Sequence, residues 1–365
     1  MINQDPYQSK DELYMARAIQ LARRGLNSTS PNPRVGCVIV NNQKIVGEGW
    51  HSVTGGEHAE VIALDQAGQF AKGASLYVNL EPCAHTGKTP PCVEAIVASG
   101  ISRVVVGCID PNPEVRGKGI SYLAERKIEC VTDVLERQSR ELNLGFISRM
   151  EKKRPWVRLK IAAGLDGKTA LENGESQWIT SLASRKDSHH YRARSCAILT
   201  GVGTIVDDDP RLNVRHVETN RQPKKIIVDS HLRTPLSASL LKYGDVVIAT
   251  ASADSERIRV FTEKGIRVWT LPNSEGRVDL DALLTELAAD EINEVLVEAG
   301  VNLHSALFNA RLVNEMIVYY APKFLGSRGR SMLHIDGLED MQDVPERSVI
   351  DIRKFGPDLR VTIRF

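Results

Sequence analysis

Four side chains whose types suit metal chemistry occur close together in the sequence. His58 and Glu60 are separated by one residue, and Cys83 and Cys92 follow, each directly after a proline. One imidazole and two thiolates can hold zinc while leaving a fourth coordination position for water, whose pKa then falls towards neutrality. Glu60 is too close to His58 in the sequence for both side chains to bind the same metal ion easily. We therefore expect Glu60 to take the proton of the water and pass it to a ring nitrogen and to the departing ammonia. These residues predict the chemistry of a zinc-hydroxide deaminase.

The main alternative is a structural zinc site, or two cysteines that are simply buried. A structural site needs a fourth protein ligand, because structural zinc is almost always held tetrahedrally by four side chains. Cys108 and Cys130 are the conceivable fourth ligands, and both lie in apolar contexts typical of strands. The upstream histidine and glutamate, and the proline before each of Cys83 and Cys92, favour the catalytic interpretation.

Two helices are predicted to begin at these positions. Gly55-Gly56-Glu57 leads into a helix that begins near His58, and Pro90-Pro91 marks the start of a helix whose first turn carries Cys92. Helix N-termini carry partial positive charge, which favours thiolates and a metal-bound hydroxide. We therefore expect two helix ends to converge on the metal.

Apolar runs and helical patterns alternate through the first half of the chain. Unbroken apolar runs predict strands covered on both faces, and apolar spacings of three predict helices with one buried face. Cys37 lies in such a run and is most simply a core residue. The alternation implies an α/β sandwich. The predicted strands are 35–40, 44–50, 76–79 and 103–108, and the predicted helices are 11–24, 58–64, 93–98, 119–126 and 133–150.

A charged stretch that ends in a proline, residues 151–155, marks a predicted domain boundary, giving domains over 1–150 and 155–365. Alternating elements in the second domain imply a mostly parallel sheet covered on both faces, with the last strand antiparallel at its edge. The adjacent His189 and His190 are expected on a helix surface, because neighbouring residues point in different directions. The strands are predicted at 156–162, 196–200, 225–229, 246–250, 267–271, 294–298, 316–321 and 359–365, and the helices at 184–194, 255–264, 280–289 and 303–311.

Two glycine turns follow predicted strands in this domain. Gly201-Val202-Gly203 does not complete the dinucleotide-binding pattern Gly-x-Gly-x-x-Gly, because the third glycine would fall on Val206. Residues 295–300 lead into a helix whose first N–H groups could cradle a phosphate. Taken alone, each turn is also explained by backbone geometry that requires glycine.

The composition indicates a soluble globular protein with a small-molecule substrate. Hydrophobic residues at 42% and charged residues at 25% are globular averages, and a net charge of +1 gives no large field to attract nucleic acid. Six irregularly spaced cysteines favour a reducing, cytoplasmic location over a disulfide framework. The sequence has neither an apolar leader nor a stretch long enough for a membrane helix, so neither export nor membrane attachment is expected.

The loop between the two cysteines departs from the short Pro-Cys-x-x-Cys of cytidine and nucleic-acid deaminases. Residues 82–92, together with Pro31-Asn32-Pro33-x-Val35-Gly36 and Asp110-Pro111-Asn112-Pro113, closely resemble the pyrimidine deaminase of riboflavin biosynthesis. The resemblance spans most of residues 10–150 and implies a cytidine-deaminase-like α/β/α sandwich. It also implies contacts to the substrate and its ribose phosphate from Asn32, His51, His85, Lys88 and Asn112.

Five motifs in the second half resemble, in order, the reductase domain of the same pathway. They are 159–160, 166–170, 174–180, 201–210 and 297–300, within a resemblance that covers 155–365. The resemblance implies a dihydrofolate-reductase-like α/β fold that uses NADPH. Lys160 and Asp208 are the candidate polar groups at the reacting carbon. NADPH contacts are implied for Ala162, Trp178, Thr204, Asp208, Ser230, Gly300, Val301, Asn302, Leu303, His304, Ser305 and Ala306, and substrate contacts for Ser176, Arg192, Leu212, Arg215 and Glu298.

The chemistry of these side chains agrees with the implied roles. Arg192 and Arg215 suit bidentate phosphate contacts, and the flat ring of Trp178 can pack on a nicotinamide or a ribose. Seen singly, however, an arginine on the helix 184–194 would be a solvated residue and Trp178 would be a core residue. Only the order of the motifs favours the functional roles.

The whole chain therefore resembles the bifunctional deaminase/reductase family of riboflavin biosynthesis. The resemblance implies deamination of 2,5-diamino-6-(5-phosphoribosylamino)pyrimidin-4(3H)-one, followed by hydride transfer from NADPH to the ribosyl group of 5-amino-6-(5-phosphoribosylamino)uracil. It also implies a homo-oligomer, either a dimer or a tetramer.

One alternative is a nucleoside or nucleic-acid deaminase with an appended domain. The near-zero net charge and the long loop between the cysteines count against it. The other is a regulatory module that binds zinc and nucleotide without turnover.

Overall fold

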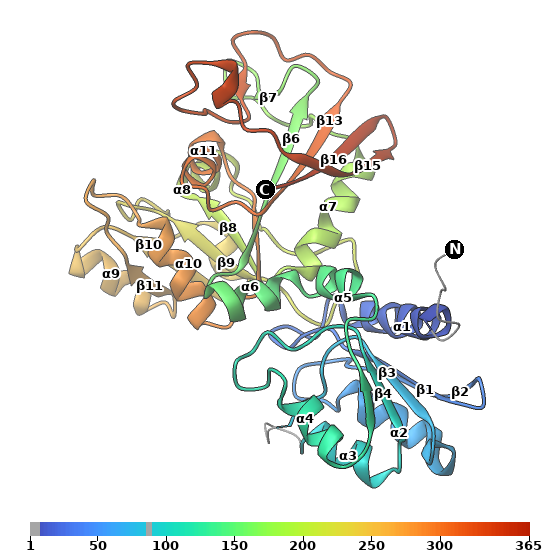
Figure 1. The fold of residues 1–365 in the computed structure, drawn as a ribbon. Coiled ribbons are helices and arrows are strands. Elements are labelled where there is room, and N and C mark those ends of the chain that lie inside the picture. Colours follow the sequence, from blue (N-terminus) through green and yellow to red (C-terminus); the bar gives the residue numbers. More distant parts are fainter. Residues whose placement is uncertain (1–7, 85–89) are drawn as a thin grey trace. The chain divides into compact units, whose positions relative to one another are not determined.

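The computed structural model describes residues 8–84 and 90–365 (Figure 1). Chain contacts divide it into two compact units, residues 1–153 and 154–365. Each unit has its own sheet and its own hydrophobic core. The predicted α/β fold class is therefore observed in both units.

The first unit is built on a five-stranded sheet in the order β2-β1-β3-β4-β5. β1 is antiparallel to both β2 and β3, whereas β3, β4 and β5 are parallel. The predicted apolar runs become the central strands because both of their faces are covered. The bounds are β1 Gly36–Asn41, β2 Lys44–Trp50, β3 Ser75–Val78, β4 Arg103–Val106 and β5 Glu129–Val131.

Helices cover both faces of this sheet, which confirms the α/β/α sandwich. Alternate residues of β1 enter different cores: Val38 packs with α1, and Ile39 packs with the helices of the other face. The latter core includes residues of α2, α3 and α4. The helices are α1 Gln8–Ala22, α2 Ala59–Ala67, α3 Cys92–Ala98, α4 Lys118–Glu125, α5 Glu136–Leu142 and α6 Leu144–Lys152, with short 3-10 turns at Arg23–Gly25 and Gly68–Ala71.

Helix α2 lies directly against strand β2. A Cβ atom built on Gly49 would stand 2.2 Å from the carbonyl oxygen of Ala59, which is the first residue of α2. Only glycine permits such a close approach between a strand and a helix backbone. Gly49 therefore fixes the position of the helix end that carries His58 and Glu60.

The prediction of one long helix over 133–150 is wrong. The helix is divided into α5 and α6 at Asn143, whose side chain bonds the backbone of Arg34. Asn143 Oδ1 accepts from Arg34 N at 2.8 Å, and Nδ2 donates to Arg34 O at 3.0 Å. This buried pairing is a long-range contact that helical periodicity alone does not reveal.

The second unit contains a nine-stranded sheet in the order β11-β10-β9-β8-β12-β6-β13-β16-β15. The strands from β11 to β13 are parallel, and β16 and β15 are antiparallel additions. The predicted edge position of the last strand is wrong, because β15 pairs with its outer side. The bounds are β6 Trp156–Gly164, β8 Ala197–Gly201, β9 Lys224–Val228, β10 Val246–Thr250, β11 Arg267–Thr270, β12 Glu294–Val297, β13 Glu315–Ala321, β15 Ser348–Phe355 and β16 Asp358–Arg364, with β7 Lys168–Ala170 and β14 Arg330–Ser331 forming a separate pair.

Both faces of this sheet are covered, as predicted. Within β9, Ile226 enters the core that includes residues of α10 and α11, and Ile227 enters the core that includes residues of α8 and α9. The helices are α7 Leu182–Arg194, α8 Val202–Asp208, α9 Ser255–Thr262, α10 Leu280–Ala289 and α11 Val301–Asn309, with 3-10 turns at Ser239–Lys242 and Met341–Asp343.

Candidate functional site

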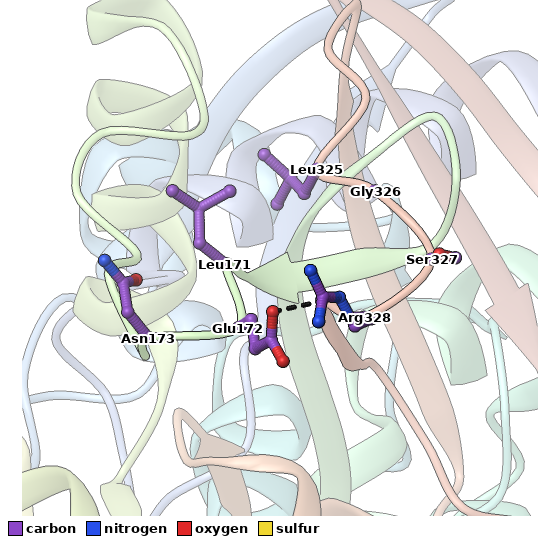
Figure 2. Close-up of a pocket in the computed structure, with 8 residues that line it drawn as sticks. Leu171, Glu172, Asn173, Leu325, Gly326, Ser327 and Arg328 are labelled. Carbon is purple, nitrogen blue, oxygen red and sulfur yellow. Dashed lines mark ion pairs between the residues drawn. The ribbon is translucent and has the colours of Figure 1, made fainter.

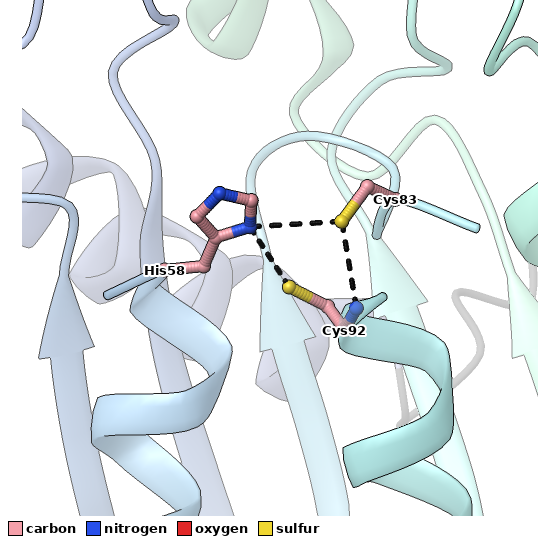
Figure 3. A group of neighbouring side chains, drawn as sticks. All are labelled: His58, Cys83 and Cys92. Atoms are coloured by element: carbon pink, nitrogen blue, oxygen red, sulfur yellow. Dashed lines mark hydrogen bonds between the residues drawn. The ribbon is translucent and has the colours of Figure 1, made fainter. Parts of the chain in front are cut away.

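The predicted metal ligands of the first unit converge at two helix ends (Figure 3). His58 precedes α2, Cys92 begins α3, and Cys83 follows β3. Potential ligand atoms of the three residues lie within 4.8 Å of one another. His58 Nδ1 is 3.0 Å from Cys92 Sγ and 3.6 Å from Cys83 Sγ. One imidazole and two sulfurs at this spacing fit a zinc ion with an open fourth position.

The two thiols lie in different electrostatic environments. The pKa of Cys83 is lowered to about 4, first by a hydrogen bond with Cys92 and then by His58. The Cys83 thiolate and burial together raise the pKa of Cys92. Cys83 also accepts a hydrogen bond from the backbone N–H of Cys92 at 3.4 Å. Both thiols accept or share hydrogen bonds at the same point, and a bound cation would favour ionisation of both.

Glu60 lies beside this cluster in the first turn of α2. Its side chain is 3% exposed, and burial raises its pKa to about 7, although the nearby His58 opposes the rise. A carboxyl group with a pKa near neutrality can both accept and return a proton. The position suits the proton-transfer role predicted for Glu60.

Two predicted substrate residues lie next to each other near the metal ligands. Asn32 Nδ2 is 3.1 Å from His51 Nε2, and the ring centroid of His51 is 5.6 Å from that of His58. His51 is buried, and burial lowers its pKa. Asn112 lies in a turn where its Oδ1 accepts the N–H of Glu114. The predicted contacts of His85 and Lys88 fall outside the described residues.

The second unit contains a large cavity among the ends of its parallel strands. Its volume is about 780 Å³, and parallel α/β sheets commonly bind ligands at the carboxyl ends of their strands. Most of the predicted reductase residues line it. They are Lys160, Ala162, Ser176, Arg192, Thr204, Asp208, Leu212, Ser230, Glu298, Gly300, Val301, Asn302, Leu303, His304 and Ala306.

Glu298 and two cations form the charged centre of this cavity. Arg192 donates to both carboxylate oxygens of Glu298, at 2.5 and 2.9 Å, and Lys160 Nζ lies 3.7 Å away. Although burial opposes ionisation, the charges of Arg192 and Lys160 lower the pKa of Glu298 to about 2. Burial also lowers the pKa of Lys160. The guanidinium of Arg192 is thus directed at Glu298 in this arrangement.

The cavity also has features that fit phosphate and dinucleotide binding. Helices α8 and α11 begin at its wall after Gly201 and Gly300, and neither start has a side-chain cap. A Cβ built on Gly300 meets no atom within 4 Å, so the helix end has space for a ligand group. Nε2 of His304 is buried without a hydrogen-bond partner in the described structure, and burial lowers its pKa to about 4.

Three predicted reductase residues lie outside this cavity lining: Trp178, Arg215 and Ser305. Trp178 is 63% exposed, and the guanidinium of Arg185 stacks 4.2 Å from its ring. Arg215 is exposed and donates to Asn213 Oδ1 at 3.0 Å. Ser305 is buried and accepts a hydrogen bond from His334 N.

The expectation that His189 lies on a helix surface is wrong, whereas His190 is exposed. His189 is 4% exposed, and its Nδ1 accepts the backbone N–H of Arg215 at 3.2 Å. Its ring stacks edge-on with His216 at a centroid distance of 4.7 Å. Burial lowers the pKa of His189 to about 4, which keeps this acceptor neutral near pH 7.

Several residues that line the 780 Å³ cavity were not predicted, including Asp207, Arg233, Arg277 and Arg330.

A separate recess of about 610 Å³ is lined by 171–173 and 325–329 (Figure 2). Glu172 and Arg328 form an ion pair there at 3.1 Å, but both side chains are more than half exposed. Such a pair stabilises little, and no predicted site residue lines the recess.

Within 8–84 and 90–365, no helix has the length and apolar character needed to cross a membrane.

Comparisons with known proteins identify both units. Residues 155–361 match the family described as the RibD C-terminal domain, and residues 8–108 match the cytidine and deoxycytidylate deaminase zinc-binding region. The riboflavin biosynthesis protein RibD of Escherichia coli (strain K12) is 45% identical over 96% of this chain and 98% of its own length. The RibD protein of Aquifex aeolicus (strain VF5) is 42% identical over 96% and 97%.

Solved structures match nearly the whole chain. Form 1 of Acinetobacter baumannii RibD superposes with a TM-score of 0.92 at 41% identity, covering 98% of this chain and 99% of its own. A Thermotoga maritima diaminohydroxyphosphoribosylaminopyrimidine deaminase/5-amino-6-(5-phosphoribosylamino)uracil reductase gives 0.87 at 33% identity, with the same coverage. This chain belongs to the RibD family of riboflavin biosynthesis proteins.

Proposed function

We propose that this chain performs two consecutive reactions of riboflavin biosynthesis. The 1–153 unit deaminates 2,5-diamino-6-(5-phosphoribosylamino)pyrimidin-4(3H)-one, and the 154–365 unit reduces the ribosyl group of 5-amino-6-(5-phosphoribosylamino)uracil to ribityl. The observation that carries the proposal is the convergence of His58, Cys83 and Cys92 beside the buried Glu60. The charged cavity around Glu298 supports the second activity.

In the deaminase, His58, Cys83 and Cys92 would hold the zinc ion. Zinc, when bound there, acts as a Lewis acid that lowers the pKa of water. Glu60 accepts a proton on its carboxylate and returns it to the pyrimidine ring nitrogen and the leaving ammonia. Asn32 and His51, which lie 3.1 Å apart, orient the substrate, and Asn112 contributes from its turn.

In the reductase, the cavity positions the sugar and the cofactor against each other. NADPH, when bound, supplies the hydride for C1 of the ribosyl group. The first N–H groups of α11 would hold a phosphate of the cofactor, and Thr204 and Ser230 line the same cavity. Lys160 and Asp208 act as the polar groups at the reacting carbon. Glu298, held by Arg192, fixes the charged wall that faces the substrate.

Two assays with the purified full chain test the two activities separately. Ammonia release from the diaminopyrimidine phosphate should require zinc and should be lost in Cys83→Ala. NADPH oxidation with the deaminated intermediate should continue at the wild-type rate in that variant. Ammonia release retained by Cys83→Ala would refute the zinc mechanism, and no turnover by metal-loaded wild type would favour a binding module.

The reductase assignment has its own deletion test. A chain lacking residues 155–365 should lose NADPH oxidation completely. Ammonia release by the same chain reports whether the remaining unit is folded. Normal NADPH oxidation by that truncated chain would refute the assignment of the second unit.

We also propose that the protein is a cytoplasmic homo-oligomer. The edge strand β15 exposes Val349, Ile350 and Ile352 by 55%, 44% and 61%. An exposed apolar edge strand is a common site of pairing between chains. Ile352→Lys should therefore shift the molar mass measured by light scattering towards that of one chain, whereas Arg353→Lys should not. An unchanged mass in Ile352→Lys would place the interface elsewhere.

A further inference from the structure

Glu81 is a buried carboxylate that the proposed deamination does not use directly. It lies two residues before Cys83 and is 3% exposed. Its own N–H donates to Cys108 O at 3.0 Å, which holds its backbone beside the end of β4. A buried carboxylate is retained only where hydrogen bonds or opposite charges compensate for its desolvation.

Among residues 8–84 and 90–365, the hydrogen bonds to the Glu81 carboxylate come from residues 110–120, a loop that runs into the first turn of α4. Oε2 accepts the backbone N–H of Asp110 at 3.2 Å and of Gly117 at 2.9 Å. Oε1 accepts the N–H of Gly119 at 2.9 Å and of Ile120 at 3.4 Å. These donors lie 29 to 39 residues away in the sequence, so this is a long-range tether and not a local turn.

Three of these four donors lie at the start of α4. The residue before the helix, Gly117, is left-handed and supplies no side-chain cap. The first N–H groups of a helix have no partner within the helix and attract negative charge. Glu81 therefore caps α4 from a distant part of the chain.

The loop is also packed tightly against the segment that carries the metal ligand. A Cβ atom built on Gly119 would stand 2.1 Å from Pro82 O and 3.2 Å from Glu81 Oε1. Because Pro82 directly precedes Cys83, this contact and the Glu81 hydrogen bonds join the same two segments. The loop includes Asn112, which the proposed function assigns to the substrate, and Asp110 Oδ1 accepts the N–H of Asn112 at 2.8 Å.

We propose that Glu81 is a positioning residue of the deaminase that fastens the 110–120 loop, with Asn112, to the segment that supplies Cys83. It acts through the backbone of the loop and touches neither the metal nor the reacting atoms. The inference rests on the proposed deaminase function. Loss of the tether should move the substrate loop while the zinc ligands stay in place.

Glu81→Gln in the full chain tests this role. Glutamine keeps the size of the side chain, but its amide NH₂ would replace a carboxylate oxygen that accepts two backbone N–H groups in the wild type. Donor would then face donor. The deaminase KM should rise about tenfold or more, because bonds to a charged acceptor are lost. The value of kcat should change much less, and bound zinc and NADPH oxidation should stay at wild-type levels. Hydrogen exchange at Gly117, Gly119 and Ile120 should become faster.

Two further variants make the result decisive. Glu125→Gln changes an exposed glutamate at the other end of α4 and should leave KM unchanged. Gly119→Ala keeps the Glu81 carboxylate, but its new methyl group pushes the loop away from Pro82, so the deaminase KM should rise in the same way. This variant tests the proposal independently of whether Glu81→Gln folds. Faster hydrogen exchange in Glu81→Gln with an unchanged KM would overturn the proposal. Loss of bound zinc and a fall in kcat in the same variant would overturn it as well. Absence of deamination by the wild type would instead refute the proposed function.

Discussion

Cys83 and Cys92, the two candidate sulfur ligands, have pKa values shifted in opposite directions. Hydrogen bonding lowers the pKa of Cys83, while the resulting thiolate and burial raise the pKa of Cys92. A positive charge beside the pair would favour ionisation of both thiols. Cysteines elsewhere in the unit lack this arrangement: burial raises the pKa of Cys37 and Cys108, which suits core residues.

We predict that Cys92→Ser removes the metal and the deaminase activity together. A serine hydroxyl is a poor zinc ligand, so the loss of affinity should exceed the roughly 10–100-fold effect typical of residues outside the ligand set. Metal analysis after dialysis should find little zinc, and NADPH oxidation should be unchanged. Cys130→Ser is the matched control, because Cys130 lies on β5 and bonds backbone carbonyls. Full zinc retention in Cys92→Ser would exclude Cys92 as a ligand.

We predict that Glu298 makes the stability of the second unit sensitive to acid. Its pKa is lowered from 4.5 to about 2 in the folded protein, so its contribution to stability is present above pH 4.5 and is lost as the pH falls towards 2. The difference corresponds to about 3 kcal/mol of unfolding free energy near neutral pH. Glu298→Gln should therefore destabilise this unit at pH 6 and have little effect near pH 2.

Denaturant unfolding at several pH values measures this difference. Glu286→Gln is the control, because Glu286 is exposed on α10 and should give the same small change at every pH. A constant destabilisation by Glu298→Gln from pH 6 to pH 2 would show that packing, and not the ion pair with Arg192, determines the effect.

At the scale of elements, the close contact between β2 and α2 holds the helix end that carries Glu60 and follows His58. Gly49→Ala should push α2 away, because its Cβ would lie 2.2 Å from Ala59 O. We expect the unit to lose about 1–3 kcal/mol of stability and to bind zinc more weakly, since His58 and Glu60 move with the helix. Thermal unfolding and zinc titration check both effects. Lys44→Ala, exposed at the other end of β2, should cause neither, and normal zinc affinity in Gly49→Ala would contradict this account.

The sequence predicted elements best where burial or pairing with the next strand determines them. The run 35–40 differs from β1 by one residue at each end, because β1 is buried on both faces. The prediction 44–50 coincides with β2, which pairs with β1 along its length. The metal set was predictable because residue type and spacing carry the chemistry. Glu81 was not, since its partners are backbone groups brought close only by the fold. Residue Asn143 interrupted a predicted helix for the same reason.

A buried charge cluster joins the starts of three neighbouring strands in the second unit. Arg158 on β6 pairs with Glu294 of β12 and with Glu315 of β13, and its side chain is 1% exposed. Arg158→Met would leave both glutamates with less positive charge in a buried position. We expect a loss of about 3–5 kcal/mol in the unfolding free energy of this unit, against less than about 1 kcal/mol for the exposed Arg353→Met. Equal effects of the two substitutions in denaturant unfolding would refute a structural role for the cluster.

For the whole molecule, the two candidate sites are made of residues from different units. The candidate metal ligands His58, Cys83 and Cys92 lie within 1–153, and the residues that line the 780 Å³ cavity lie within 154–365. Each unit also buries its own apolar core. A ligand that binds only folded protein stabilises the unit that holds its site.

This separation predicts two unfolding transitions that respond to different ligands. Removal of zinc with a chelator should lower the melting temperature of one transition, and NADPH should raise that of the other. A ligand at a hundred times its Kd contributes about 2.7 kcal/mol to the unit that binds it. Differential scanning calorimetry of wild type and Cys83→Ala separates the effects, because the variant should respond to NADPH but not to the chelator. A single transition that both treatments shift would show that the two units unfold together.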